Sequence, residues 1–271
     1  MTLLELAGLL LLGSATGFLA GLFGIGGGML MVPFMTLLLT AQKVPLEHVV
    51  HMAIATSLAT IMVTSISSVR AHHARGSVLW PAVKTLAPGI LLGSLVGAQV
   101  ASMLPMPPLA VLFAAFVGFS ATQMLINRKP KPSRELPGAV GMFGMGNVIG
   151  LLSSLVGAGG GFVSVPFMVW CNVTMQRAVG TSAALGFPIA AAGTVGYVWA
   201  GWRELGPPTW EFAGYVYLPA LVAIGATSVM TAPLGARVAH AIDVARLRRG
   251  FAGLLYLLAG YMLWKAFGAG S

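Results

Sequence analysis

The hydrophobic pattern of the chain consists of long apolar runs separated by short polar gaps. Each run has about 20 residues, which is enough to cross a hydrocarbon core of about 30 Å as a helix and too many for a strand of a membrane barrel. The pattern therefore predicts an all-α, multi-pass membrane protein with roughly 8 to 10 membrane segments. The runs cover residues 3–23, 48–68, 85–104, 109–126, 137–156, 178–202, 212–231 and 250–267.

Two stretches of this pattern are too long for a single crossing. No charged residue occurs between Glu5 and Lys43 or between Glu135 and Arg177, which leaves uncharged stretches of 37 and 41 residues. As straight helices they would be roughly 55 and 60 Å long. We therefore expect each stretch to be broken, as a discontinuous helix or a re-entrant hairpin, with a half-helix as its second arm.

Three consecutive glycines lie in the middle of each stretch. They belong to the segments GLFGIGGGMLMVPFM at 21–35 and SLVGAGGGFVSVPFM at 154–168. Glycine adopts the backbone conformations that a helix break requires and lets a ligand approach the backbone. Pro33 and Pro166 are expected in the first turns of the new helices, where a missing N–H costs little. The breaks are therefore predicted at the glycines.

The two glycine segments are part of a duplication. At an offset of 133 residues, eleven positions of residues 17–35 recur identically in residues 150–168, and ATSLA at 55–59 recurs as GTSAA at 180–184. With five crossing equivalents expected in each copy, an odd number, the second copy is predicted to enter the membrane with inverted topology, as in many secondary transporters that bind substrate near the midplane. The predicted membrane repeats are residues 1–135 and 136–271.

Composition and charge support a membrane location. The chain is 57% hydrophobic and 8% charged, and its net charge of +9 comes from basic residues in the short gaps, with no aromatic-laced patch for nucleic acid. If both glycine stretches are broken, 12 of the 15 Lys and Arg residues share one side, against 3 on the other. The positive-inside rule then predicts a multi-pass protein of the cell inner (plasma) membrane with both termini outside the cytoplasm.

The broken stretches predict an anion site. New helices beginning near Met29 and Phe162 would direct unpaired N–H groups and the positive end of the helix dipole at a midplane cavity. Hydroxyls of the two Thr-Ser pairs could donate to the same anion, or could instead bond back to their own helix. The candidate substrate-binding residues are Gly24, Gly26, Gly27, Gly28, Met29, Thr56, Ser57, Gly157, Gly159, Gly160, Gly161, Phe162, Thr181 and Ser182.

Several other glycines have a simpler interpretation. They are spaced four residues apart, which is the small-residue spacing that lets membrane helices pack closely. The two glycine triplets, each with a Val-Pro pair further on, do not follow that spacing. The glycines assigned to packing are Gly17, Gly21, Gly89, Gly93 and Gly97.

The sequence offers little for catalysis or cofactor chemistry. The glycine segments do not follow the dinucleotide or phosphate-loop patterns, and His48 and His51 lack a third metal ligand. His72 and His73 are interpreted as solvated loop residues. We expect no enzyme, no cofactor and no metal. The expected partners are a small anionic substrate, the lipid bilayer and, as a possible homodimer, a second copy of the chain.

The paired glycine segments, the two Thr-Ser segments and the helix segment GSLVGAQVA resemble the TauE/SafE family, also called TSUP, over nearly the whole chain. The resemblance implies a multi-pass transporter that moves sulfite, sulfoacetate, thiosulfate or related sulfur oxyanions, usually outward. Architecture and resemblance together predict a secondary transporter that exports a small sulfur-containing anion (sulfite, sulfoacetate or a related organosulfonate) by alternating access at a midplane site. An anion channel is the alternative.

Overall fold

The structure, a computed structural model, describes residues 3–24, 27–126, 135–241 and 245–268. Within these residues the chain forms ten helices and one short antiparallel hairpin, in which Phe212 pairs with Tyr217. The elements are α1 (Leu3–Phe23), α2 (Gly28–Ala41), α3 (Leu46–His73), α4 (Trp80–Met103), α5 (Met106–Ile126), α6 (Ala139–Val156), α7 (Gly161–Trp170), α8 (Met175–Leu205), β1 (Phe212–Ala213), β2 (Val216–Tyr217), α9 (Leu218–Ala241) and α10 (Ala245–Gly268).

The eight apolar runs correspond to eight helices that are long and apolar enough to cross a membrane, so the all-α, multi-pass fold is confirmed. One boundary is wrong: the run expected at 212–231 opens with the β1–β2 hairpin, and its helix begins only at Leu218. Two helices are longer than expected, since α3 has 28 residues and α8 has 31. Among the eight spanning helices they are also the most deeply buried.

Both predicted breaks are present. Two glycines at each break adopt left-handed backbone angles, with φ of +67° at Gly24, +73° at Gly27, +67° at Gly157 and +75° at Gly160. An L-residue with a side chain would be strained there. The helices that follow, α2 and α7, have 14 and 10 residues, or roughly 21 and 15 Å. Each second arm is therefore a half-helix, as expected.

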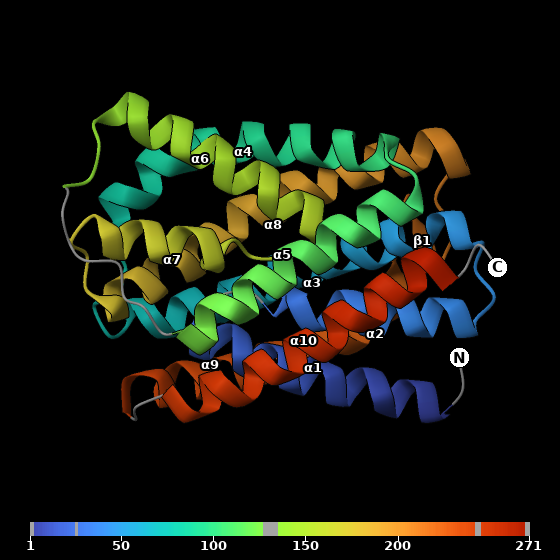
Figure 1. Ribbon diagram of the computed structural model, residues 1–271, viewed down its shortest axis with the longest axis horizontal. Helices are drawn as coiled ribbons and strands as arrows, with labels where there is room; N and C mark the ends of the chain where they lie inside the picture. Colours follow the sequence, from blue (N-terminus) through green and yellow to red (C-terminus); the bar gives the residue numbers. More distant parts are fainter. Residues whose placement is uncertain (1–2, 25–26, 127–134, 242–244, 269–271) are drawn as a thin grey trace.

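The outer ends of the broken pairs lie at opposite ends of the molecule. In Figure 1, α1 begins and α2 ends at the right, where α10 also ends, whereas α6 begins and α7 ends at the left. The right-hand end also holds the hairpin, the start of α3 and the ends of α4 and α8. The left-hand end holds the end of α3 and the starts of α4 and α8.

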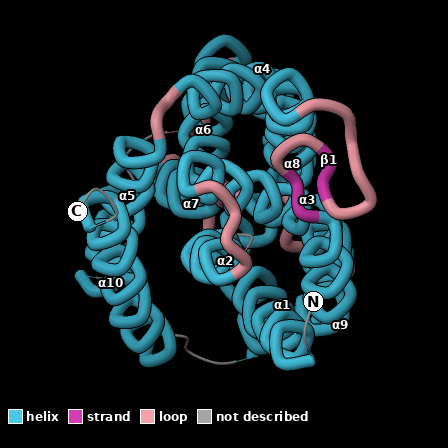
Figure 2. The backbone as a smooth tube through the Cα atoms, turned by 90° about the vertical axis from the view of Figure 1, so that its right-hand side faces the viewer, coloured by secondary structure: helices cyan, strands magenta, loops and turns pink. Residues whose placement is uncertain are grey.

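The remaining helices pack around the half-helices in pairs that join the two halves of the chain. Seen from one end, α2 and α7 lie in the middle, and α1 with α9, α4 with α6, and α5 with α10 surround them (Figure 2). Small residues allow this approach: a Cβ on Gly93 would overlap the backbone of Asn147 in α6, and one on Gly17 would overlap Ser228 in α9. The packing interpretation of these glycines is confirmed.

Candidate functional site

The two helix breaks meet in the interior of the bundle. A Cβ atom added to Gly28, the first residue of α2, would overlap the carbonyl oxygen of Gly157 and lie 3.0 Å from Cα of Ala158. A Cβ on Gly157 would in turn lie 3.0 Å from the Val32 side chain in α2. The backbone of one break is therefore in direct contact with the backbone of the other, and only glycine fits at the contact.

Each half-helix begins with backbone amides that are not used by the helix itself. The N–H groups of Leu30 and Met31 donate to Gly27 O over 3.2 and 3.4 Å, and those of Val163 and Ser164 donate to Gly160 O over 3.1 and 2.9 Å. In the described part of the chain, the two N–H groups that precede each of these pairs have no hydrogen-bond acceptor. These donors belong to Gly28, Met29, Gly161 and Phe162, all of which are buried.

The serines of the two Thr-Ser pairs tie each half of the chain to the break of the other half. Ser57 Oγ in α3 donates to Gly157 O over 2.7 Å, and Ser182 Oγ in α8 donates to Gly24 O over 2.8 Å. Both serines are completely buried. We call these two bonds the serine clamps. Neither serine bonds back to its own helix, so in this conformation both hydroxyl protons are directed at the break carbonyls.

The threonines of the same pairs accept hydrogen bonds across the bundle. Tyr217 N, just before α9, donates to Thr56 Oγ1, and Leu79 N, just before α4, donates to Thr181 Oγ1, each over 2.9 Å. Each Thr-Ser pair is thus bonded to two points in the opposite half of the chain: the serine to the helix break of that half, and the threonine to the start of one of its helices. The sequence could not reveal these partners, because each lies more than 100 residues away.

A third matched contact supports the end of the helix before each break. His72 Nε2 in α3 lies 2.9 Å from Gly21 O in the last turn of α1, and Tyr197 O–H in α8 donates to Ser154 O in the last turn of α6 over 3.2 Å. Carbonyls in a last turn have no partner within their own helix. His72 is completely buried, so its interpretation as a solvated loop residue is wrong. His73, in contrast, is exposed.

The structure brings most of the predicted site residues together. Of the fourteen, Gly26 lies outside the described residues, and the others lie at the two breaks, in the first turns of α2 and α7 or in the Thr-Ser pairs. Gly27 packs against the Thr16 backbone, and Gly160 lies beside Ser153 and Ile189. Whether these groups bind an anion stays a prediction.

A small cavity of about 10 Å³ lies beside the first break, which is room for about one water molecule. It lies between the end of α1 and the helices α3 and α8. The sequence analysis did not identify its polar lining residues, Ser65 and Ser68. One of them, the Ser68 hydroxyl, is buried and has no hydrogen-bond partner within the described chain. The cavity is too small for a polyatomic anion such as sulfite. The lining residues are Ala20, Gly24, Ile61, Ser65, Ser68, Ala183 and Gly186.

Comparison with known proteins identifies the family. Residues 9–262 match the family described as sulfite exporter TauE/SafE. A probable membrane transporter protein of Haemophilus influenzae is 37% identical over 261 residues, covering 94% of this chain and 97% of the relative. A probable membrane transporter protein of Methanocaldococcus jannaschii is 28% identical over 276 residues, covering 96% of each. No solved structure gives a significant match. The chain therefore belongs to the TauE/SafE family of membrane transporters.

Proposed function

We propose that the protein is a secondary transporter that exports a small sulfur-containing anion, such as sulfite, sulfoacetate or a related organosulfonate, by alternating access. The carrying observation is the contact between two helix breaks, each followed by a helix whose first amides lack acceptors within the described chain. Helix N-termini bind anions through such amides and through the helix dipole. The description of the matching family as a sulfite exporter supports the choice of anion.

Inverted topology of the two halves is part of the proposal. It is supported by the broken pairs, whose outer ends lie at opposite ends of the molecule (Figure 1). It is also supported by the serine clamps and the paired threonine bonds, in which equivalent residues of the two halves exchange roles. Inverted repeats give a transporter two related conformations, each open to one side.

The charge distribution supports the orientation that we propose, in the cell inner membrane with both termini outside the cytoplasm. Arg70 lies in the last turn of α3 and Arg177 in the first turn of α8, both at the left-hand end of Figure 1. Lys265 lies in the last turn of α10, at the right-hand end. With the basic end inside, a membrane potential drives an anion outward by about 2.3 kcal/mol per charge per 100 mV, roughly a 50-fold gradient for a monoanion.

The described conformation is the closed state of the proposed cycle. An entering anion has to reach the amides at the two breaks. The serine clamps hold each break against the opposite half, so these amides are not accessible while the clamps are formed. A buried hydrogen bond contributes about 0.5–1.5 kcal/mol net, so opening one clamp costs an amount that an anion bonded to several amides can offset. Separation of the breaks would then expose the site to one side at a time.

Flux through proteoliposomes tests the proposal with sulfite, thiosulfate, sulfoacetate and acetate as solutes. We expect saturable, potential-driven efflux of the sulfur anions and little of acetate, which shares the charge but lacks sulfur. Gly28→Ala should abolish efflux, because its Cβ would overlap Gly157 O. Gly118→Ala is the matched control, because a Cβ there meets no atom within 4 Å.

Two outcomes would contradict the proposal. Normal efflux by Gly28→Ala, at normal membrane insertion, would remove the breaks from the transport path. Single-channel conductance with flux that does not saturate would favour the anion channel instead.

A further inference from the structure

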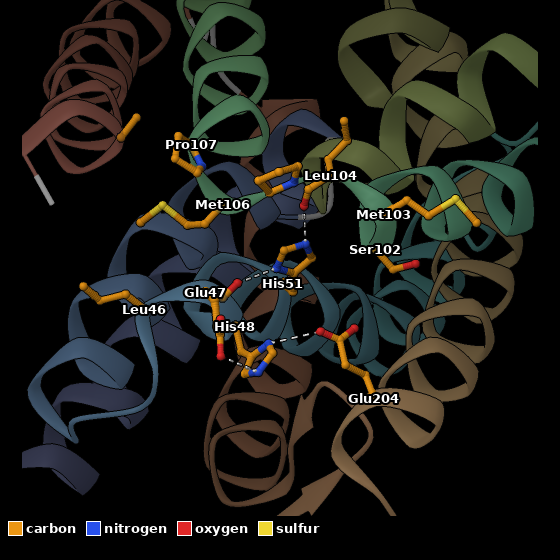
Figure 3. A pocket seen from close by; sticks show the side chains of 12 residues that line it. Leu46, Glu47, His48, His51, Ser102, Met103, Leu104, Met106, Pro107 and Glu204 are labelled. Atoms are coloured by element: carbon orange, nitrogen blue, oxygen red, sulfur yellow. Dashed lines mark hydrogen bonds and ion pairs between the residues drawn. The ribbon is translucent and has the colours of Figure 1, made fainter. Parts of the chain in front are cut away.

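A second group of polar side chains lines a pocket away from the helix breaks (Figure 3). The pocket has a volume of about 490 Å³ and lies where α3 begins, α4 ends and α8 ends, which is the right-hand end of Figure 1. Its titratable lining residues are Glu47, His48, His51 and Glu204. The proposed transport site uses none of these residues.

His51 has an unusual hydrogen-bonding environment. The residue is 4% exposed, and both ring nitrogens face backbone carbonyls. Nδ1 lies 3.1 Å from Glu47 O, and Nε2 lies 3.1 Å from Ala101 O and 3.0 Å from Leu104 O. A carbonyl oxygen only accepts hydrogen bonds, and a neutral imidazole has a single N–H. The neutral ring therefore leaves one nitrogen lone pair against a carbonyl, whereas the imidazolium donates on both sides.

Burial disfavours the charged form of His51 most strongly, and the facing carbonyls and Glu204 act against that effect in favour of a bound proton. Ala101 and Leu104 are the last-turn and capping residues of α4, where the helix dipole is negative. The ionisable groups facing His51 are Glu47 and His48 from α3, Glu204 from α8 and Tyr215 from the hairpin, and within the described chain the α4–α5 turn and α10 add none to the pocket. His48 lies between the carboxylates, 3.4 Å from Glu47 and 3.7 Å from Glu204.

Tyr215 connects the pocket to the centre of the bundle. Its ring stacks on His51 with centroids 5.4 Å apart, and its O–H donates to Glu204. Burial, and then the bond and charge of Glu204, raise the pKa of Tyr215, so the phenol stays protonated and remains a donor. Two residues further on, Tyr217 N donates to Thr56, which precedes the clamp residue Ser57. The hairpin thus joins His51 to a serine clamp.

We propose that His51 binds a proton taken from solution through this pocket, and that the protein exchanges this proton for the exported anion. The coupling rests on the proposed function. In the proposed orientation the pocket faces outside, so a proton enters from outside as an anion leaves. Both movements carry charge in the same electrical sense, so the membrane potential drives both. The charge of the His51 ring acts on the Ser57 clamp through the hairpin, in which Tyr215 stacks on His51 and Tyr217 N bonds to Thr56.

Direct observation of the proton tests the site without any substrate. The probe is magic-angle-spinning NMR of the full chain in liposomes, with ¹⁵N-labelled histidine, across the pH range from about 4.5 to 8.5 in which histidines titrate. We expect a ring resonance that is missing in His51→Gln, present in His73→Gln and moving to imidazolium shifts as the pH falls. A His51 ring that stays neutral over the whole range overturns the proposal. If His51→Gln does not fold, replacing the other four histidines one at a time identifies the resonance by elimination.

Transport tests the coupling. In proteoliposomes with sulfite and an entrapped pH dye, acidifying the compartment that the pocket faces should speed wild-type efflux several-fold, with protons moving opposite to sulfite. His51→Gln should keep potential-driven efflux and lose both the acceleration and the proton movement, while exposed His73→Gln keeps them. An unchanged pH response in folded His51→Gln overturns the coupling. Absence of any sulfur-anion flux overturns the proposed function instead, and the NMR titration then decides the proton site alone.

Discussion

The serine clamps predict an unequal cost of two equivalent substitutions. Ser57→Ala removes the one donor that the described chain offers to the buried Gly157 carbonyl, and leaving a buried acceptor unsatisfied costs about 1–3 kcal/mol. Ser182→Ala does the same to Gly24 O and also removes the acceptor of Ser164 Oγ, which donates to Ser182 over 3.0 Å. The second loss adds about 1 kcal/mol. We therefore expect Ser182→Ala to be the more destabilising of the two.

Thermal unfolding in detergent measures the difference. Cys171 is the single cysteine and is buried at the end of α7, so a thiol-reactive fluorogenic dye reports unfolding of the site region. A loss of 1 kcal/mol lowers the midpoint by roughly 2–4 °C in a chain of this size class. Ser120→Ala is the matched control, because within the described chain the hydroxyl of this buried serine bonds only to Phe116 O in its own helix. If Ser57→Ala unfolds no earlier than Ser120→Ala, or Ser182→Ala no earlier than Ser57→Ala, the clamps do not hold the breaks.

Two further predictions concern groups near the site. Ser68→Ala should leave the free energy of unfolding unchanged or raise it slightly, because the buried hydroxyl has no partner in the described chain. The same substitution should slow sulfite efflux if the cavity beside Gly24 is on the anion path. Unfolding midpoints and flux, measured on the same preparation, check the two expectations. For Tyr215, the folded-state pKa is raised above the ordinary value of about 10. The contribution of this phenol to the free energy of unfolding is therefore constant below about pH 10 and falls above it, because the phenol ionises in the unfolded state first. Tyr215→Phe should show a smaller decline in alkaline denaturation curves, and an equal decline would contradict the buried, hydrogen-bonded phenol.

The helix breaks could be predicted from the sequence because their signals are local. An uncharged stretch longer than the bilayer and a glycine triplet at its middle suffice to place the break between Phe23 and Gly28. One local detail was wrong. Pro33 and Pro166 are each the sixth residue of their helix and not in its first turn, so each removes a bond to the carbonyl of the helix's second residue. In each half-helix this carbonyl therefore loses the donor that a regular helix would supply.

The clamps could not be predicted, because their partners are set by tertiary packing. A buried serine in a membrane helix commonly bonds to its own preceding turn, and nothing in the segments around Ser57 and Ser182 indicates a partner about 100 or more residues away. His72 was misplaced for a related reason. Charge and polarity in RAHHARGS suggest a loop, but α3 extends through His73 because its last turns pack against α1.

The structure also shows where the two halves differ. Leu58 and Ala183 hold equivalent positions after the Thr-Ser pairs, and a Cβ on Gly193 would lie 2.8 Å from Leu58, which fills the space on its side. Ala183 is smaller and leaves the cavity beside Gly24. The backbone contacts and serine clamps are nearly matched in the two halves. In the proposed alternating cycle such matching would keep the two states close in free energy, and a ligand shifts such an equilibrium only by its differential affinity. In the proposed cycle we therefore expect the first break to open first, because the unfilled space lies beside it.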